Sequence, residues 1–295
     1  MAITVLDGGM GGEIQARVEG AGHGLWSAKA LVEVPEVVLD IHKEYIDAGA
    51  RIITTNTYST IPSYLGKEGM QDQYLEYAQL AGEIARRAVD ESGIPGVRVA
   101  ASVPPLSDSY RPDLVPAASE AMPIYQNLVR TLCPFVDLYI CETMSSAEEA
   151  FNAASAAVTH GENKPVFVSW TLNETPGSGL RSGESITSAY ERLQSLDIAG
   201  YMFNCTCPEA IVVGLEELRG LTDKPVGCYA NRMNKVPEGW TLDNDIQTGR
   251  RTDITTDYFI DMCAKCADAG ATIIGGCCGI GPKDIRALAG KVAAA

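Results

Sequence analysis

Short apolar runs rich in β-branched residues alternate along the chain with longer segments in which apolar residues recur at helical spacing. The short runs predict about eight strands, at residues 3–6, 51–54, 98–102, 138–141, 166–170, 201–204, 226–229 and 272–274. The longer segments predict helices, among them residues 35–48, 73–92, 147–160, 185–196, 208–218 and 256–269. Alternation of this kind is typical of parallel βα units.

About eight such units in 295 residues favour a closed (β/α)₈ barrel, the TIM barrel fold, as a single α/β domain over residues 1–295. An open, doubly wound sheet is the alternative. Two long irregular stretches, residues 104–119 and 230–252, follow the third and seventh strands. In a barrel they are loops on the catalytic face, where long insertions usually serve function.

Composition and charge narrow the range of partners. With 46% hydrophobic and 21% charged residues, the sequence is typical of a globular protein with a sizeable core. A formal net charge of -15 argues against nucleic acid or an anionic membrane, because phosphate binding requires a basic surface. The N-terminus lacks a leader pattern, and no apolar segment approaches the roughly 20 residues of a membrane span. We therefore expect a cytoplasmic protein.

The chain contains nine cysteines, and an odd number cannot be fully paired in disulfides within one chain. In a reducing cytoplasm, metal binding, chemistry or burial explains them better. Cys277 and Cys278 are adjacent, so they bridge each other only with strain, whereas both sulfurs can face one metal ion.

The clearest chemical signal is the position of cysteines directly after two predicted strands. The segment 275–279 (GGCCG) follows strand 272–274, and the segment 204–208 (NCTCP) follows strand 201–204. In a parallel barrel both segments lie at carboxyl ends of strands, and glycines let the backbone turn tightly there. Three thiolates in this place would hold Zn²⁺ with a fourth position open, as in catalytic zinc sites. The alternative is three thiols packed in the core.

Spacing alone leaves open whether Cys205 or Cys207 is the third ligand, and the two could also chelate together. Cys263 and Cys266 form a C-x-x-C pair within a helical pattern, without a framing glycine or proline, so we interpret them as ordinary helix positions. The remaining cysteines are expected at buried or strand positions: Cys133, Cys141 and Cys228.

With these motifs in view, the chain resembles the homocysteine S-methyltransferase family along essentially its whole length. The resemblance is carried by DGGMG (7–11), LWSA (25–28), HxxYIxAGA (42–50), TTNTY (54–58), ET (142–143), NC (204–205), Asn231 and GGCCG (275–279). The last motif is the most specific. The resemblance implies a (β/α)₈ barrel, and it matches Cys205, Cys277 and Cys278 to the three zinc ligands of the family.

The resemblance also implies the reaction, which is methyl transfer to the thiol of homocysteine to give methionine. A free thiol has a pKa of about 8.5, and coordination to zinc deprotonates it, so the metal would supply the nucleophile. Glu142 would receive the ammonium group of homocysteine. Asp7 and Gly8 would begin the substrate site, where backbone amides hold the carboxylate, and Thr143 would add a hydroxyl group.

A sulfonium or quaternary ammonium methyl donor is cationic and favours aromatic faces. Four aromatic residues fall at predicted strand ends or in βα loops: Trp26, Tyr58, Tyr110 and Tyr229. Asn231 lies two residues beyond Tyr229. Similarity to the compact family members implies S-methylmethionine as donor, with S-adenosylmethionine as a poorer one. The chain lacks the long C-terminal extension through which betaine-using relatives dimerise. We expect a monomer or weak oligomer.

The sequence departs from the family on the donor side. The segment 101–110 lacks the glycine-rich phrase that often follows strand three, and 229–232 (YANR) replaces a proline-containing version. Betaine, dimethylsulfoniopropionate and a methylated corrinoid therefore stand as alternative donors. A hypothesis of another class is a zinc-binding or thiol-redox protein without methyl transfer.

Overall fold

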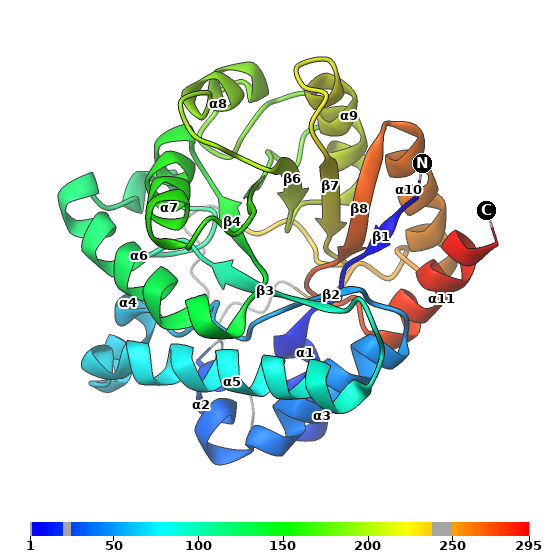
Figure 1. The fold of residues 1–295 in the computed structure, drawn as a ribbon. Coiled ribbons are helices and arrows are strands. Elements are labelled where there is room, and N and C mark those ends of the chain that lie inside the picture. Colours follow the sequence, from blue (N-terminus) through cyan, green and yellow to red (C-terminus); the bar gives the residue numbers. More distant parts are fainter. Residues whose placement is uncertain (1, 20–24, 238–248, 295) are drawn as a thin grey trace.

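The protein is represented by a computed structural model that describes residues 2–19, 25–237 and 249–294. Eight parallel strands form one sheet in the order β1-β8-β7-β6-β5-β4-β3-β2. The ends of this order meet through a parallel bridge between Leu6 and Ile52, beside a backbone hydrogen bond of 2.8 Å from Arg51 N to Val5 O. The sheet therefore closes into a barrel surrounded by helices (Figure 1), which confirms the (β/α)₈ prediction.

The strands are β1 (Thr4–Val5), β2 (Ile52–Thr54), β3 (Arg98–Val103), β4 (Leu138–Met144), β5 (Val166–Trp170), β6 (Gly200–Asn204), β7 (Val226–Ala230) and β8 (Ala271–Gly276). The α-helices are α1 (Met10–Arg17), α2 (Trp26–Glu33), α3 (Pro35–Asp47), α4 (Pro62–Leu65), α5 (Tyr74–Ser92), α6 (Ala118–Leu132), α7 (Ala147–His160), α8 (Ile186–Arg192), α9 (Pro208–Arg219), α10 (Thr256–Asp268) and α11 (Pro282–Ala293). Short 3₁₀ turns are η1 (Gly66–Glu68), η2 (Gln71–Gln73), η3 (Pro112–Leu114) and η4 (Cys133–Phe135).

All eight predicted strands are present. The helix predicted at residues 185–196 is too long, because α8 ends at Arg192 and the chain continues through i→i+3 turns such as Leu196 N to Leu193 O. Helix α6 was not predicted, and it contains Pro123, a residue that normally ends a helix. The irregular stretch predicted at 230–252 is described only at its two ends.

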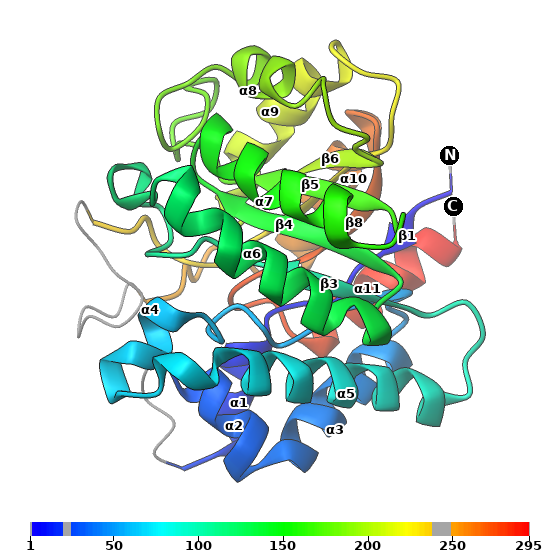
Figure 2. The same cartoon turned by 60° about the vertical axis from the view of Figure 1, so that its left-hand side comes forward.

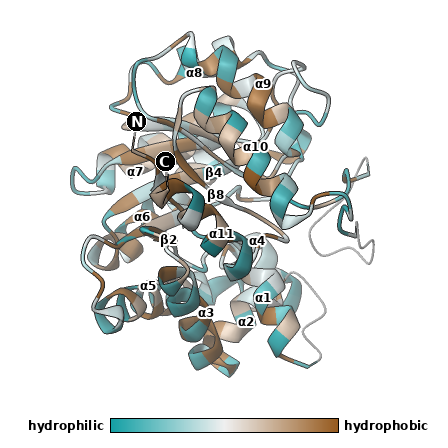
Figure 3. Cartoon of the chain, turned by 90° about the vertical axis from the view of Figure 1, so that its right-hand side faces the viewer, coloured by the Kyte–Doolittle hydropathy of each residue, from teal (hydrophilic) through white to brown (hydrophobic). Residues whose placement is uncertain are grey.

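Successive side chains on each strand point alternately out toward the helices and into the barrel, which gives two apolar layers. One layer joins the strands to the surrounding helices, which pack outside the sheet in Figure 2 and carry hydrophilic residues on their outer faces in Figure 3. The other layer fills the barrel: Leu6, Ile52, Ala100, Leu138, Ile140, Phe167, Met202, Tyr229 and Ile273. The barrel interior is therefore a packed core rather than a channel. Within the described residues, no helix combines the length and apolarity of a membrane crossing.

The contact between β8 and the first strand generates a stability prediction. A Cβ atom on Gly275 would lie 2.6 Å from Leu6 Cβ and 2.7 Å from Asp7 O, where β8 meets the first strand. Because neither neighbour is the end of a flexible side chain, Gly275→Ala is expected to lower the free energy of unfolding by about 1–3 kcal/mol. Chemical denaturation measures this change.

Gly290→Ala is the matched control. Gly290 is exposed in α11, and its added methyl group would meet nothing within 4 Å. That substitution is expected to leave stability unchanged or raise it by up to about 1 kcal/mol, because alanine favours helix. Equal effects of the two substitutions would contradict close packing between β8 and the first strand.

Candidate functional site

A layer of polar side chains lies one step above the apolar filling of the barrel. Side chains two residues apart on a strand share a face, so each residue two positions beyond a filling residue points into the barrel nearer its carboxyl end. On five strands these residues are Thr54, Ser102, Glu142, Ser169 and Asn204. Together they form a floor layer beneath a cavity of about 460 Å³, a volume within the usual range of small-molecule sites. Thr54, Ser102 and Glu142 line this cavity, whereas Ser169 and Asn204 are buried below its surface.

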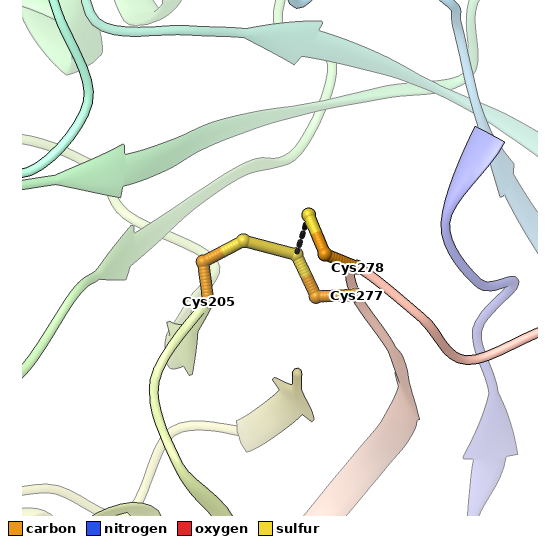
Figure 4. A group of neighbouring side chains, drawn as sticks. All are labelled: Cys205, Cys277 and Cys278. Atoms are coloured by element: carbon orange, nitrogen blue, oxygen red, sulfur yellow. Dashed lines mark hydrogen bonds between the residues drawn. A yellow bond between two sulfur atoms is a disulfide. The ribbon is translucent and has the colours of Figure 1, made fainter. Parts of the chain in front are cut away.

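Three cysteine sulfurs gather at the rim of this cavity. Cys205 follows β6, while Cys277 and Cys278 follow β8, and all three sulfurs lie within 4.8 Å of one another. Figure 4 shows the side chains pointing toward one another, with 4.0 Å between the sulfurs of Cys277 and Cys278. The three residues therefore form the candidate metal centre.

Two of these cysteines are joined in the structure. A disulfide links Cys205 to Cys277, whereas Cys278 is free and exposed (Figure 4). The sequence expectation was three thiolates, and the disulfide arises because the fold places these sulfurs in contact. A disulfide sulfur is not a thiolate ligand, so metal binding by all three requires the reduced protein.

Strand β7 supports both cysteine turns. Cys205 N donates to Tyr229 O at 3.2 Å, and Cys277 N donates to Ala230 O at 2.8 Å. Arg232 N, just beyond β7, donates to Cys278 O at 2.8 Å. The backbone hydrogen bonds of one strand end thus fix the places of all three candidate ligands.

The N-terminal glycine turn packs directly on the β8 turn. Gly9 N donates to Ile280 O at 2.9 Å, and the hydroxyl of Tyr45 donates to both Gly9 O and Ile280 O. A Cβ on Gly9 would lie 2.8 Å from Cys277 O. This close approach explains why the DGGMG segment requires glycine beside the metal centre.

Glu142 is held by two hydroxyl groups in the floor. Ser102 Oγ donates to one carboxylate oxygen, and Tyr229 donates to the other at 3.0 Å. Burial raises the pKa of Glu142, and these two hydrogen bonds oppose the rise. The sequence predicted Tyr229 as a contact of the methyl donor. In the structure its hydroxyl group positions the Glu142 carboxylate.

Asp7 is the second acidic group of the cavity. Its carboxylate accepts hydrogen bonds from Thr54, at 2.7 Å from the backbone nitrogen and 3.1 Å from the hydroxyl. Burial raises the pKa of Asp7 to about 8, and the charge of Glu142 adds to the rise. Two buried acids in one cavity disfavour each other's charge, so a cationic group between them would be stabilised.

The sequence interpretation did not single out Asn204 as a floor residue, although it quoted the Asn-Cys motif. Its side-chain oxygen accepts from Thr143 N at 2.8 Å and Ser169 Oγ at 2.7 Å, while its amide nitrogen donates to Thr143 Oγ1 at 2.7 Å. Thr143 and Cys205 both have positive φ, at 59° and 49°. The Asn204 side chain therefore holds Thr143, a strained residue beside Glu142, and Asn204 directly precedes the second strained residue, Cys205, at the candidate metal centre.

The cavity brings together nearly all residues expected from the sequence. Its lining includes Asp7, Gly8, Tyr58, Tyr110, Glu142, Thr143, Cys205, Tyr229, Asn231, Cys277 and Cys278. The side chain of Trp26 lies outside the described part of the chain. The hydroxyl of Tyr58 is 2.6 Å from Ser109 Oγ, and the ring of Tyr110 lies under the guanidinium of Arg181 at 4.7 Å.

The other cysteines lie outside the three-sulfur group. The thiol of Cys207 donates to Glu174 O at 3.6 Å, on the loop that follows β5. Cys263 and Cys266 are buried in α10, as the helical pattern predicted. The three cysteines expected at buried positions are buried: Cys133, Cys141 and Cys228.

Comparison with known proteins agrees with this geometry. The family described as homocysteine S-methyltransferase matches residues 4–292. A homocysteine S-methyltransferase from Escherichia coli is 30% identical, over 97% of this chain and 94% of that protein. A selenocysteine methyltransferase from Astragalus bisulcatus is 28% identical, over 97% and 91%. The E. coli homocysteine methyltransferase MmuM in its metallated form has a TM-score of 0.82 at 27% identity, covering 99% of this chain and 96% of that one.

The fold and site together define a (β/α)₈ barrel enzyme with a three-cysteine centre at the carboxyl ends of its strands. The chain belongs to the homocysteine S-methyltransferase family, which confirms the resemblance carried by its sequence motifs. A metal is implied by the metallated form of MmuM, and an oxidized form of that protein has a TM-score of 0.83.

A buried acid beneath the site gives a pH prediction. Glu149 in α7 accepts two hydrogen bonds of 2.7 Å from Ser145, in the turn that follows Glu142. Burial raises its pKa from 4.5 to about 7, so the folded state holds this proton more tightly than the unfolded chain. The resulting stabilisation is complete below about pH 4.5 and is lost as the pH rises through about 7.

Glu149→Gln should remove this pH dependence while keeping an acceptor for Ser145. The difference in unfolding free energy between variant and wild type is expected to shift in favour of the variant by on the order of 3 kcal/mol from pH 5 to pH 8. Chemical denaturation at both pH values measures it. Glu148→Gln, at an exposed neighbouring position, is the control and should show no such shift. A pH-independent difference for Glu149→Gln would contradict the assignment.

Proposed function

We propose that this protein transfers a methyl group from a sulfonium donor, S-methylmethionine or less effectively S-adenosylmethionine, to the thiol of homocysteine, giving methionine. The observation that carries the proposal is one cavity that contains a three-cysteine group and two buried carboxylates. The three-cysteine group can hold a metal that activates a thiol, and the carboxylates can receive the ammonium group of an amino acid. A metal-storage protein would have no need of such carboxylates.

The donor set fits Zn²⁺. Thiolates bound about 2.3 Å from a tetrahedral zinc lie roughly 3.8 Å apart, close to the 4.0 Å between the sulfurs of Cys277 and Cys278. In the reduced protein Cys205, Cys277 and Cys278 would hold the ion. Bound zinc would supply a Lewis acid that lowers the pKa of a substrate thiol and keeps its sulfur nucleophilic.

The protein's own residues would bind and orient homocysteine. Glu142, fixed by Ser102 and Tyr229, would receive the ammonium group. Glu142 lies close enough to Asp7 to raise the pKa of Asp7, so an ammonium group between the two would favour their charged forms. The backbone of Gly8 and the hydroxyl of Thr143 would complete the amino-acid end of the site. Cavity walls that exclude water would protect the sulfur during transfer.

On the donor side, Tyr58, Tyr110 and Asn231 line the same cavity and would surround the sulfonium group. Betaine, dimethylsulfoniopropionate and a methylated corrinoid remain donors to be tested against S-methylmethionine. Selenocysteine belongs among the acceptors to be tested, because one relative is a selenocysteine methyltransferase. We further propose that the chain is a cytoplasmic monomer or weak oligomer, which size-exclusion chromatography with light scattering tests.

The metal centre is tested with Cys278→Ala in reduced protein. Loss of one of three thiolates is expected to abolish stoichiometric zinc binding and zinc-dependent methionine formation across the donor panel. Zinc content by elemental analysis and methionine by mass spectrometry are the two measurements. Cys207→Ala is the matched control, because its thiol faces Glu174 O, and it should retain both. Full zinc content and turnover in Cys278→Ala would contradict the proposed ligand set.

Glu142→Gln separates substrate binding from metal binding. The variant should retain zinc, but its KM for homocysteine is expected to rise about 10- to 100-fold, because a charge-assisted hydrogen bond to ammonium is lost. Steady-state kinetics and zinc content measure the two effects. An unchanged KM with full zinc content would refute the role of Glu142, whereas loss of zinc would place that residue in the metal site.

A further inference from the structure

A pair of opposite charges stands on the cavity wall, apart from the acidic floor. Arg181 and Glu174 both belong to the loop between β5 and α8, and Arg181 Nη2 lies 2.5 Å from Glu174 Oε1. Both line the cavity, and their side chains are only 11% and 12% exposed. The pair is therefore much better shielded from water than an ordinary surface ion pair.

The surroundings hold this pair in one geometry. Glu174 Oε2 accepts from Cys207 N at 3.1 Å, which ties the loop to the turn that carries Cys205. The guanidinium of Arg181 stacks on Tyr110 at 4.7 Å, and Arg181 N donates to Thr171 O at 3.2 Å. A charged pair fixed in this way is preorganised for a ligand.

Arg181 has binding capacity that its contacts do not use. Its Nε donor is buried and has no hydrogen-bond partner among the described residues. A buried donor without a partner destabilises the folded protein, and a carboxylate that pairs with the guanidinium edge would remove this cost. The unsatisfied donor points to an anionic group as the missing ligand.

The charges around the cavity assign this ligand to the donor. Asp7 and Glu142 make the floor acidic, and Arg250, the other cationic lining residue in the described chain, is exposed to water. Arg181 is thus the shielded anchor for a carboxylate, and the adjacent Glu174 suits an ammonium group. Two opposite charges side by side complement the head group of a free amino acid.

We propose that Arg181 and Glu174 form the subsite that binds the α-carboxylate and α-ammonium groups of the methyl donor, which is therefore a sulfonium-bearing amino acid. This inference rests on the proposed methyl transfer and assigns its donor specificity to two residues of the β5–α8 loop. Dimethylsulfoniopropionate, which has the carboxylate but no ammonium group, would make only the Arg181 contact.

Isothermal titration calorimetry on reduced, zinc-loaded protein tests the subsite independently of turnover. Arg181→Gln is expected to weaken binding of both S-methylmethionine and dimethylsulfoniopropionate by about 10- to 100-fold. Glu174→Gln should weaken S-methylmethionine by a similar factor without weakening dimethylsulfoniopropionate. Arg192→Gln is the matched control, because Arg192 also stacks on an aromatic ring, Phe151, and pairs with Glu148, but outside the cavity. Its binding constants should equal those of the wild type.

The outcomes separate the subsite from the reaction. If wild-type protein makes methionine but Arg181→Gln and Glu174→Gln bind S-methylmethionine as tightly as the wild type, the subsite is wrong and the reaction stands. If wild-type protein binds S-methylmethionine through these residues but transfers no methyl group, the subsite stands and the proposed function is wrong. Failure of the wild type to bind either sulfonium compound overturns the subsite.

Discussion

The whole site depends on the convergence of three sulfurs over the end of one strand. Cys205 and Cys277 follow β6 and β8, the two neighbours of β7, yet their Cα atoms are only 5.7 Å apart. Strands two places apart in a sheet are separated by about 9–10 Å. The two cysteines come closer than their strands because the segments after β6 and β8 both turn inward over β7. Cys205 and Gly279 have left-handed backbone conformations in these turns. The position of the candidate metal centre is therefore set by the two turns that pack over the end of β7.

Three layers of side chains follow one another along the barrel axis, and each has a different role. Apolar residues fill the lower barrel, polar residues form the floor, and sulfurs lie at the rim. The floor groups hold one another, as Asn204 holds Thr143 and Ser102 holds Glu142. Such a network is costly when incomplete and rigid when satisfied, so it fixes the carboxylate relative to the metal centre. The proposed donor subsite lies on a separate wall of the cavity, formed by the loop after β5.

Sequence periodicity predicted the strands and the barrel because each strand is apolar on two faces and each helix on one. The cysteine motifs predicted the three-sulfur group, because residues at carboxyl ends of parallel strands share one rim. The period of two could also have identified Ser102, Ser169 and Asn204, since each lies two residues beyond a filling residue. Arg181 and Glu174 gave no such signal, because their pairing depends on the path of a loop. The disulfide between Cys205 and Cys277 likewise gave no signal, because the spacing of cysteines along the sequence does not give the distance between their sulfurs.

In the proposed site the three cysteines hold a metal with one coordination position left for the substrate sulfur. Zinc K-edge X-ray absorption on reduced, zinc-loaded protein, with and without homocysteine, tests it most directly. Three sulfur ligands at about 2.3 Å are expected in the free protein, and four when homocysteine is bound. A sulfur count that does not change on addition of homocysteine would contradict it.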